Sequence, residues 1–142
     1  TDANGVYSSA TDWISDSQAF EAGYENTFGM DFNKDGLISG GNHYRLMGDS
    51  GAVMMQRFNN GLGWNDNTSK YWDVVAAKNN STNFQVLFNG TDIREGYNFI
   101  WTTDANGVYS SNTGWISDAQ TVSSGYENLF NMDINNNGAI GF

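Results

Sequence analysis

Residues 31–38 read Asp-Phe-Asn-Lys-Asp-Gly-Leu-Ile, and this stretch decides how the rest of the sequence is interpreted. Oxygen-bearing side chains stand at its first, third and fifth positions, a glycine at the sixth and an aliphatic residue at the eighth. A hard cation such as Ca²⁺ needs about six to eight oxygens around it, and alternate residues of a tightly curled loop can point inward to supply them. Gly36 permits the sharp turn that such a loop requires. The spacing therefore predicts the front half of a calcium-binding loop of the EF-hand type.

Residues 133–140 repeat the pattern as Asp-Ile-Asn-Asn-Asn-Gly-Ala-Ile. We call residues 31–38 loop one and residues 133–140 loop two. Loop two has one carboxylate where loop one has two, so we expect it to bind calcium more weakly. An affinity of about 0.1–1 mM, typical of extracellular modules, would suffice where calcium is abundant. The predicted ligands are the side chains of Asp31, Asn33, Asp35, Asp133, Asn135 and Asn137 and the carbonyls of Leu37 and Ala139.

Both loops depart from the EF-hand pattern at its end. Position twelve of loop one is Asn42 rather than a bidentate glutamate, and the sequence reaches Phe142 before loop two has a twelfth position. A further ligand must therefore come from elsewhere in the chain. Glu25 and Glu127, which precede the loops in a predicted helix, are candidate donors. We favour the interpretation that both are solvated surface glutamates, with the donor role as the alternative.

The segments before the two loops are copied as well. Residues 1–40, the first copy, align without a gap on residues 103–142, the second copy, with about 25 of 40 positions identical. The copies start 102 residues apart, at Thr1 and Thr103. We predict that residues 1–40 are the rear part of one repeat and residues 41–142 one full repeat. The sequence therefore looks like a slice of a tandem array.

Residues 42–102 differ from the copies, because short aromatic and aliphatic runs alternate there with clusters of Gly, Asn, Asp and Ser. This pattern predicts an antiparallel β-meander, and the fold class is α+β, mainly β. Residues 104–107, Asp-Ala-Asn-Gly, form a hairpin turn into the second copy. In the first copy Val6 and Tyr7 lack an incoming strand, either because the chain was cut there or because a neighbouring molecule supplies one. The predicted strands are residues 43–47, 53–58, 71–77, 84–88 and 97–102.

Each copy carries a helix start signal. Ser15 with Gln18, and Ser117 with Gln120, have the spacing of a capping box. Apolar residues then recur every four positions, which predicts one helix of about three turns with an apolar face before each loop. These residues are Phe20, Tyr24 and Phe28 in the first copy and Val122, Tyr126 and Phe130 in the second. Trp13 and Trp115 precede the caps and are interpreted as core aromatics, with ligand stacking as the alternative.

Composition and charge exclude several function classes. Sixteen acidic and six basic residues give a formal charge of −10, which argues against nucleic acid or an anionic membrane surface as partner. No apolar run is long enough for membrane insertion. The chain has no cysteine, and its one histidine, His43, is most simply a strand residue. Nucleophilic and phosphoryl chemistry have no recognisable residues here, so we predict no enzymatic activity.

The order of these elements resembles the tryptophan-rich C-terminal domain family of cyanobacterial and other bacterial secreted proteins. The resemblance is strongest in residues 99–107, the Gly-Trp-Ile-Ser stretch at 114–117, and residues 126–130 and 132–138, and it is looser at 44–47 and 71–73. It implies an exported, extracellular or cell-surface protein, repeated in tandem and dependent on calcium, with no enzymatic activity of its own. The loops also resemble those of dockerins, but loop one runs into Ser39-Gly40-Gly41 rather than an exit helix.

Two functions are compatible with these patterns. The first is a structural repeat that assembles head to tail with copies of itself in a surface fibre, filament or layer. The second is a calcium-dependent carbohydrate-binding or adhesion module of a larger secreted protein, with aromatic side chains forming a platform for polysaccharide. Exposed, coplanar aromatics such as Trp64 or Trp72 would favour polysaccharide binding. Aromatics buried between successive units would favour assembly.

Overall fold

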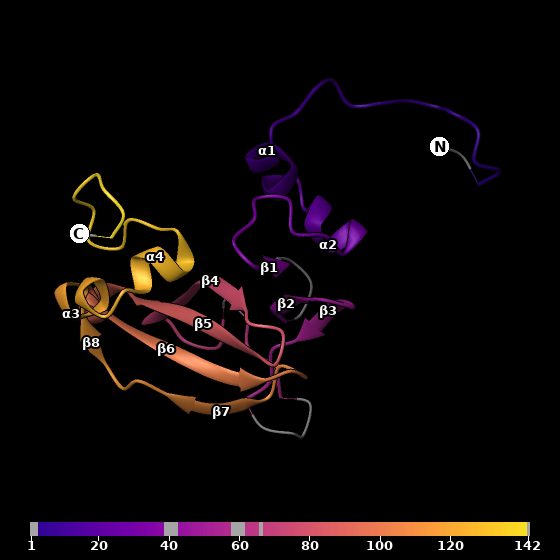
Figure 1. The fold of residues 1–142 in the computed structure, drawn as a ribbon. Helices are drawn as coiled ribbons and strands as arrows, with labels where there is room; N and C mark the ends of the chain where they lie inside the picture. Colours follow the sequence, from indigo (N-terminus) through magenta and orange to yellow (C-terminus); the bar gives the residue numbers. More distant parts are fainter. Residues whose placement is uncertain (1–2, 39–42, 58–61, 66, 142) are drawn as a thin grey trace.

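The computed structural model describes residues 3–38, 43–57, 62–65 and 67–141 (Figure 1). It is mainly β, with two antiparallel sheets and a few short helices, so the predicted fold class is confirmed at that level. The predicted positions at residues 1–2, 42, 58 and 142 lie outside the described residues.

One sheet has the order β1-β2-β3, formed by β1 (Leu37–Ile38), β2 (Arg45–Gly48) and β3 (Gly51–Met54). The other has the order β4-β5-β6-β7, formed by β4 (Trp72–Asn79), β5 (Asn83–Gly90), β6 (Tyr97–Asp104) and β7 (Tyr109–Asn112), with β8 (Ile116–Ser117) also paired to β6.

The five predicted strands of the meander correspond to β2–β6, and their boundaries differ from the prediction by a few residues. The largest shift is in β3, which begins at Gly51 rather than at residue 53. Gly48 pairs with Gly51 across a two-residue turn, so pairing starts immediately after that turn. Pairing with β2 stops at Met54, and Met55 turns into the core with none of its surface exposed. The predicted hairpin at residues 104–107 is confirmed, since Gly107 N donates to Asp104 O at 3.1 Å.

The five-stranded sheet is covered on both faces, because its side chains alternate between two apolar clusters. In β6, Trp101 packs with Leu46 of the three-stranded sheet, whereas its neighbour Ile100 packs with Ile134 of loop two. The first cluster holds most of the aromatic residues, and the Phe88 and Phe99 rings stack in it at 4.4 Å. The sheet thus separates a core shared with β1–β3 from a smaller core beneath the second copy.

Both capping boxes are confirmed, but the single three-turn helix is wrong in both copies. The first copy has α1 (Asp16–Glu21) and α2 (Tyr24–Phe28), and the second has α3 (Asp118–Ser123) and α4 (Tyr126–Phe130). Gly23 and Gly125 separate the pairs with φ angles of 77° and 82°, a left-handed conformation that ends a helix. A 3₁₀ turn, η1 (Asp92–Arg94), joins β5 to β6. No helix among the described residues is both long and apolar enough to cross a membrane.

The prediction that Trp13 and Trp115 are core residues is also wrong. Trp13 is fully exposed, and the arm that carries it runs away from the rest of the chain (Figure 1). Trp115 is 54% exposed and lies between the Trp72 ring, at 5.5 Å, and the Arg94 guanidinium, at 3.9 Å. The guanidinium makes a cation–π contact with the indole there.

Candidate metal centre

In loop one the predicted side-chain ligands turn back onto the loop backbone. Asp31 Oδ1 accepts from Lys34 N at 2.6 Å, and its Oδ2 accepts from Gly36 N at 2.8 Å. Asn33 Oδ1 accepts from Asp35 N at 3.2 Å, and Asp35 Oδ1 accepts from Leu37 N at 2.8 Å. The amide of Asn33 also donates to Asp35 Oδ2 at 3.0 Å. These bonds hold the oxygens of the first, third and fifth positions on a curled backbone.

The backbone of loop one curls because two of its residues are left-handed. Lys34 has a φ of 63° and Gly36 a φ of 84°. In loop two the residues at the same positions, Asn136 and Gly138, have φ angles of 56° and 85°. Side chains other than glycine rarely adopt this conformation, so its occurrence at the fourth position of both loops reflects a requirement of the loop shape.

Loop two repeats three of the contacts of loop one, but Asp133 Oδ1 accepts from Asn137 N at 3.1 Å, at the fifth position, whereas Asp31 Oδ1 accepts from the fourth. Asp133 Oδ2 accepts from Gly138 N at 2.8 Å. Asn135 Oδ1 accepts from Asn137 N at 3.1 Å, and Asn137 Oδ1 accepts from Ala139 N at 2.9 Å. The structure therefore brings together the predicted side-chain ligands within each loop in similar hydrogen-bonding patterns, although loop two has asparagine where loop one has Asp35.

The interpretation of Glu25 and Glu127 as solvated surface residues is wrong, because neither exposes any of its surface. Glu25 Oε1 accepts from the backbone N–H groups of Phe32 and Asn33 at 3.0 and 3.3 Å. Glu127 Oε1 accepts from Ile134 N at 2.8 Å and Asn135 N at 3.2 Å. Each carboxylate thus anchors the start of its loop to the preceding helix.

The sequence contains a signal for this role that the periodicity argument misses. Both copies keep glutamate at this position, immediately after Tyr24 or Tyr126, whereas Glu21 in the same helical region is replaced by Ser123. Glu25 and Glu127 are thus retained in two diverged copies, whereas Glu21, four residues before Glu25, is not. A carboxylate retained in this way indicates a side chain with a specific partner.

The carboxylates of loop one lie in an environment that disfavours their charge. Burial raises the pKa of Asp35 to about 6, and the negative charges of Asp31 and Glu25 add to the effect. Burial also raises the pKa of Asp31, again with a contribution from Glu25. A divalent cation at this loop would relieve both the desolvation and the repulsion.

These pKa values predict how stability depends on pH in a chelator. The folded pKa of Asp35 lies above its unfolded value of 3.8, so its contribution favours folding below pH 3.8 and is lost as the pH rises through about 6. We expect Asp35→Asn to remove this fall in the free energy of unfolding, since asparagine does not titrate. Urea denaturation between pH 4 and 7 measures the difference between wild type and variant. Parallel profiles for the two proteins would contradict the prediction.

Loop one contacts both sheets, in addition to the bond that Arg45 Nη2 of β2 donates to Asn26 Oδ1 of α2 at 2.9 Å. Ala77 N of β4 donates to Asp35 O at 2.7 Å, and Met47 N of β2 donates to Gly36 O at 3.1 Å. Leu37 pairs with Leu46 and exposes 2% of its surface. Loop one therefore covers part of the outer edge of β4, where backbone groups need a partner.

Loop two docks differently. It contributes Ile134, which exposes 7% of its surface, to the cluster beneath the second copy, whereas Ile140 near its end is exposed. The two loops therefore have similar internal bonds but different surroundings, and among the described residues it is loop one that pairs with the three-stranded sheet.

The donor set of loop one suits a hard cation. Among the described residues, no group of three or more His, Cys, Asp or Glu side chains is placed to hold a metal ion. A site in loop one would therefore use the amide oxygen of Asn33 and the carbonyl of Leu37 together with Asp31 and Asp35. All of these are oxygen donors, which Ca²⁺ prefers over softer ligands.

Other polar residues of the described chain offer less for a function. His43 lies just before β2, and its Nδ1 is buried without a hydrogen-bond partner among the described residues. The ring lies so close to Gly63 that a side chain there would overlap it, which makes His43 a packing residue. Comparison of the chain with protein-family models, with curated proteins and with solved structures found no match.

Proposed function

We propose that the chain is a non-enzymatic, calcium-stabilised structural repeat, exported to the extracellular space or cell surface, that joins head to tail with copies of itself in a fibre, filament or layer. The observation that carries the proposal is the position of loop one. Glu25 holds its start against α2, while its carbonyls receive hydrogen bonds from β4 and β2. Residues 1–40 would then be the rear part of one repeat and residues 41–142 the next, with loop one as the joint.

Calcium would act on this joint through the loop's shape. A cation bound by Asp31, Asn33, Asp35 and the Leu37 carbonyl would neutralise the partly buried carboxylates and hold the curled backbone. Because calcium would bind only the ordered form of loop one, its binding free energy would stabilise that form. The angle between α1–α2 and the sheets would consequently be fixed when calcium is bound. Loop two, with a single carboxylate, would bind more weakly.

The positions of the aromatic residues support assembly over polysaccharide binding. Trp64 makes edge contacts with Phe88 and Trp101 at 5.0 and 5.4 Å, and Trp72 contacts Phe99 at 4.6 Å. Both indoles are thus engaged with the core cluster rather than arranged as a flat exposed platform. The most exposed aromatics of the described chain lie instead in the first copy, where Trp13 and Tyr7 have no sheet beside them.

The joint can be tested by a distance measurement between two spin labels, because the natural chain has no cysteine. Ser17→Cys in α1 and Thr82→Cys in the turn between β4 and β5 place labels at two exposed sites on either side of loop one. We expect one narrow distance distribution in calcium and a broad one in chelator. In a labelled chain that also carries Asp31→Asn and Asp35→Asn, the distance distribution should be broad in calcium and in chelator. Identical distributions in all conditions would contradict the proposal.

Assembly is tested separately by electron microscopy of a tandem array of residues 1–102, because each unit of that array carries loop one and the junction Thr102–Thr1 matches Thr102–Thr103. We expect straight rods in calcium that become flexible after chelation, since each joint would lose its fixed angle. Rods that are equally straight in both conditions would show that calcium does not set the joint.

A further inference from the structure

The second copy shows what its residues bind when they are docked. Its backbone pairs with β6, where Thr113 N donates to Ile100 O at 3.1 Å and Thr113 Oγ1 accepts from Ile100 N at 3.1 Å. Asp118 N donates to Gly96 O at 3.0 Å, and Asp118 Oδ1 accepts from Asn98 Nδ2 at 2.7 Å. These bonds attach the segment to the middle of β6 and to Gly96, just before that strand.

Apolar side chains of the second copy complete this attachment. Ile116 of β8, Tyr126 and Phe130 of α4 and Ile134 of loop two pack as one cluster against the five-stranded sheet. On the sheet side the contact is made by small and aliphatic residues. They are Val75, Ala76, Leu87 and Ile100.

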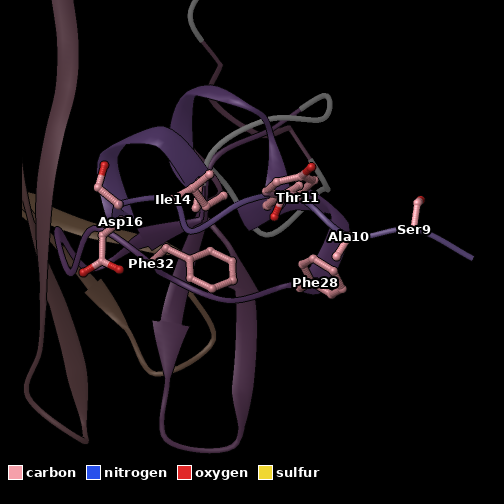
Figure 2. A pocket seen from close by; sticks show the side chains of 10 residues that line it. Ser9, Ala10, Thr11, Ile14, Asp16, Phe28 and Phe32 are labelled. Carbon is pink, nitrogen blue, oxygen red and sulfur yellow. The ribbon is translucent and has the colours of Figure 1, made fainter. Parts of the chain in front are cut away.

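The first copy has the same docking residues around an empty space. Figure 2 shows Ile14, Phe28 and Phe32 around a cavity of about 640 Å³, which Tyr24 also lines. Three of these four are identical to their counterparts in the second copy, and the fourth pairs Phe32 with Ile134. Phe28 is 62% exposed, although a phenylalanine of an amphipathic helix is ordinarily covered.

The polar attachment points are kept as well. Thr11 and Asp16, the counterparts of Thr113 and Asp118, lie on the rim of the same cavity (Figure 2). Tyr7 is 74% exposed, whereas its counterpart Tyr109 packs on the Trp101 ring at 4.9 Å. The first copy therefore presents both the residues that form a strand in the second copy and the apolar face of a docking segment, with no sheet of the described residues against them.

We infer that residues 6–32 form a docking surface for an antiparallel β-sheet with the chemistry of β4–β6, supplied by a repeat that precedes this one in a tandem chain. The strand of that sheet offers backbone groups to Thr11 and an asparagine to Asp16. Its face offers Ala, Leu and Ile side chains to the cavity, and an arginine covers Trp13. This inference rests on the repeat part of the proposed function and is independent of its calcium part.

A second copy of the whole chain is not the occupant. Its β6 is already paired with its own β7 and β8, and its sheet face is already covered by its own α4 and loop two. An arm from another molecule would have to displace a segment of similar sequence that is held covalently at high effective concentration. Only a sheet without its own following segment is available.

The test adds such a sheet to the full chain. A second copy of residues 41–102 is placed directly before Thr1, so that the junction Thr102–Thr1 reproduces Thr102–Thr103 of the natural sequence. Hydrogen exchange is then followed at the amides of Tyr7, Thr11 and Asp16. We expect exchange there to slow by about 100-fold relative to the unextended chain, because these amides would enter a stable ladder.

The matched control is Ile14→Asp with Phe28→Asp. Because both side chains are exposed in the unextended chain, its stability should be unchanged, whereas the extended chain should lose protection at residues 7–16. Protection at Tyr109, Thr113 and Asp118 should persist in both. Fast exchange at residues 7–16 of the extended wild type overturns the inference. An added segment that stays unprotected overturns it equally, since the first copy would then fail to complete a sheet.

Calcium and chelator are compared in the same extended chain. A calcium response at loop one with an unprotected arm rejects this inference and leaves the calcium proposal intact. A protected arm without any calcium response at loop one supports this inference and rejects the calcium proposal.

Discussion

Gly36→Ala is expected to lower the free energy of unfolding by about 4 kcal/mol, whereas Gly138→Ala, at the same position of loop two, should cost only about 1–2 kcal/mol. Both glycines are left-handed, with φ angles of 84° and 85°. A methyl group on Gly36 would overlap the carbonyl oxygen of Ala77 in β4, whereas one on Gly138 would meet no described atom within 4 Å. The loss of stability in Gly138→Ala therefore measures backbone strain alone. The additional loss of stability in Gly36→Ala is the free energy needed to move loop one away from β4.

Urea denaturation of both variants, followed by tryptophan fluorescence, measures this difference. The excess should persist in chelator, because the overlap does not depend on a bound cation. Equal losses for the two variants would mean that loop one does not lie against β4 as described.

Glu127→Ala is expected to cost about 3 kcal/mol. Its carboxylate accepts from Ile134 N and Asn135 N, and its second oxygen accepts from Gly141 N at 2.8 Å. Removing the side chain leaves these N–H groups without their acceptor at a buried site, which costs more than an ordinary hydrogen bond. Glu25→Ala should act in the same direction through Phe32 and Asn33.

Two controls separate the charge from the contact. Glu127→Gln keeps the size and one acceptor oxygen, so it should cost less than Glu127→Ala. Glu21→Ala removes an exposed glutamate of α1 and should change stability by less than about 0.5 kcal/mol. Thermal unfolding followed by circular dichroism distinguishes the variants. A loss at Glu127 no larger than that at Glu21 would contradict the anchoring role.

The parts of the fold that sequence reasoning predicts are those set by local chemistry. The capping boxes at Ser15 and Ser117 form because the hydroxyl and the side chain three residues later satisfy each other's backbone groups. The hairpin at residues 104–107 follows from its turn residues. The alternation of Phe99 and Trp101 with Ile100 assigns these side chains to opposite faces of β6, as the structure shows.

The parts that sequence reasoning misses are a local break in each helix and the contacts between residues distant in the chain. A spacing of four residues suggested one helix across Gly23, but the left-handed glycine ends α1 and starts a new axis. The burial of Glu25 requires the loop to fold back over the helix, which the periodicity of the helix does not indicate. The position of loop one against β4 depends on Ala77, some forty residues away in the sequence, and no local pattern encodes it.

Titration calorimetry of the full chain measures whether loop one binds calcium. We expect one calcium site of about 0.1–1 mM affinity that Asp31→Asn with Asp35→Asn abolishes, and a weaker site that Asp133→Asn alone removes. Magnesium should bind less well, because it requires a smaller and more regular shell. Absence of heat at millimolar calcium, or unchanged binding in the loop-one variant, would contradict the account.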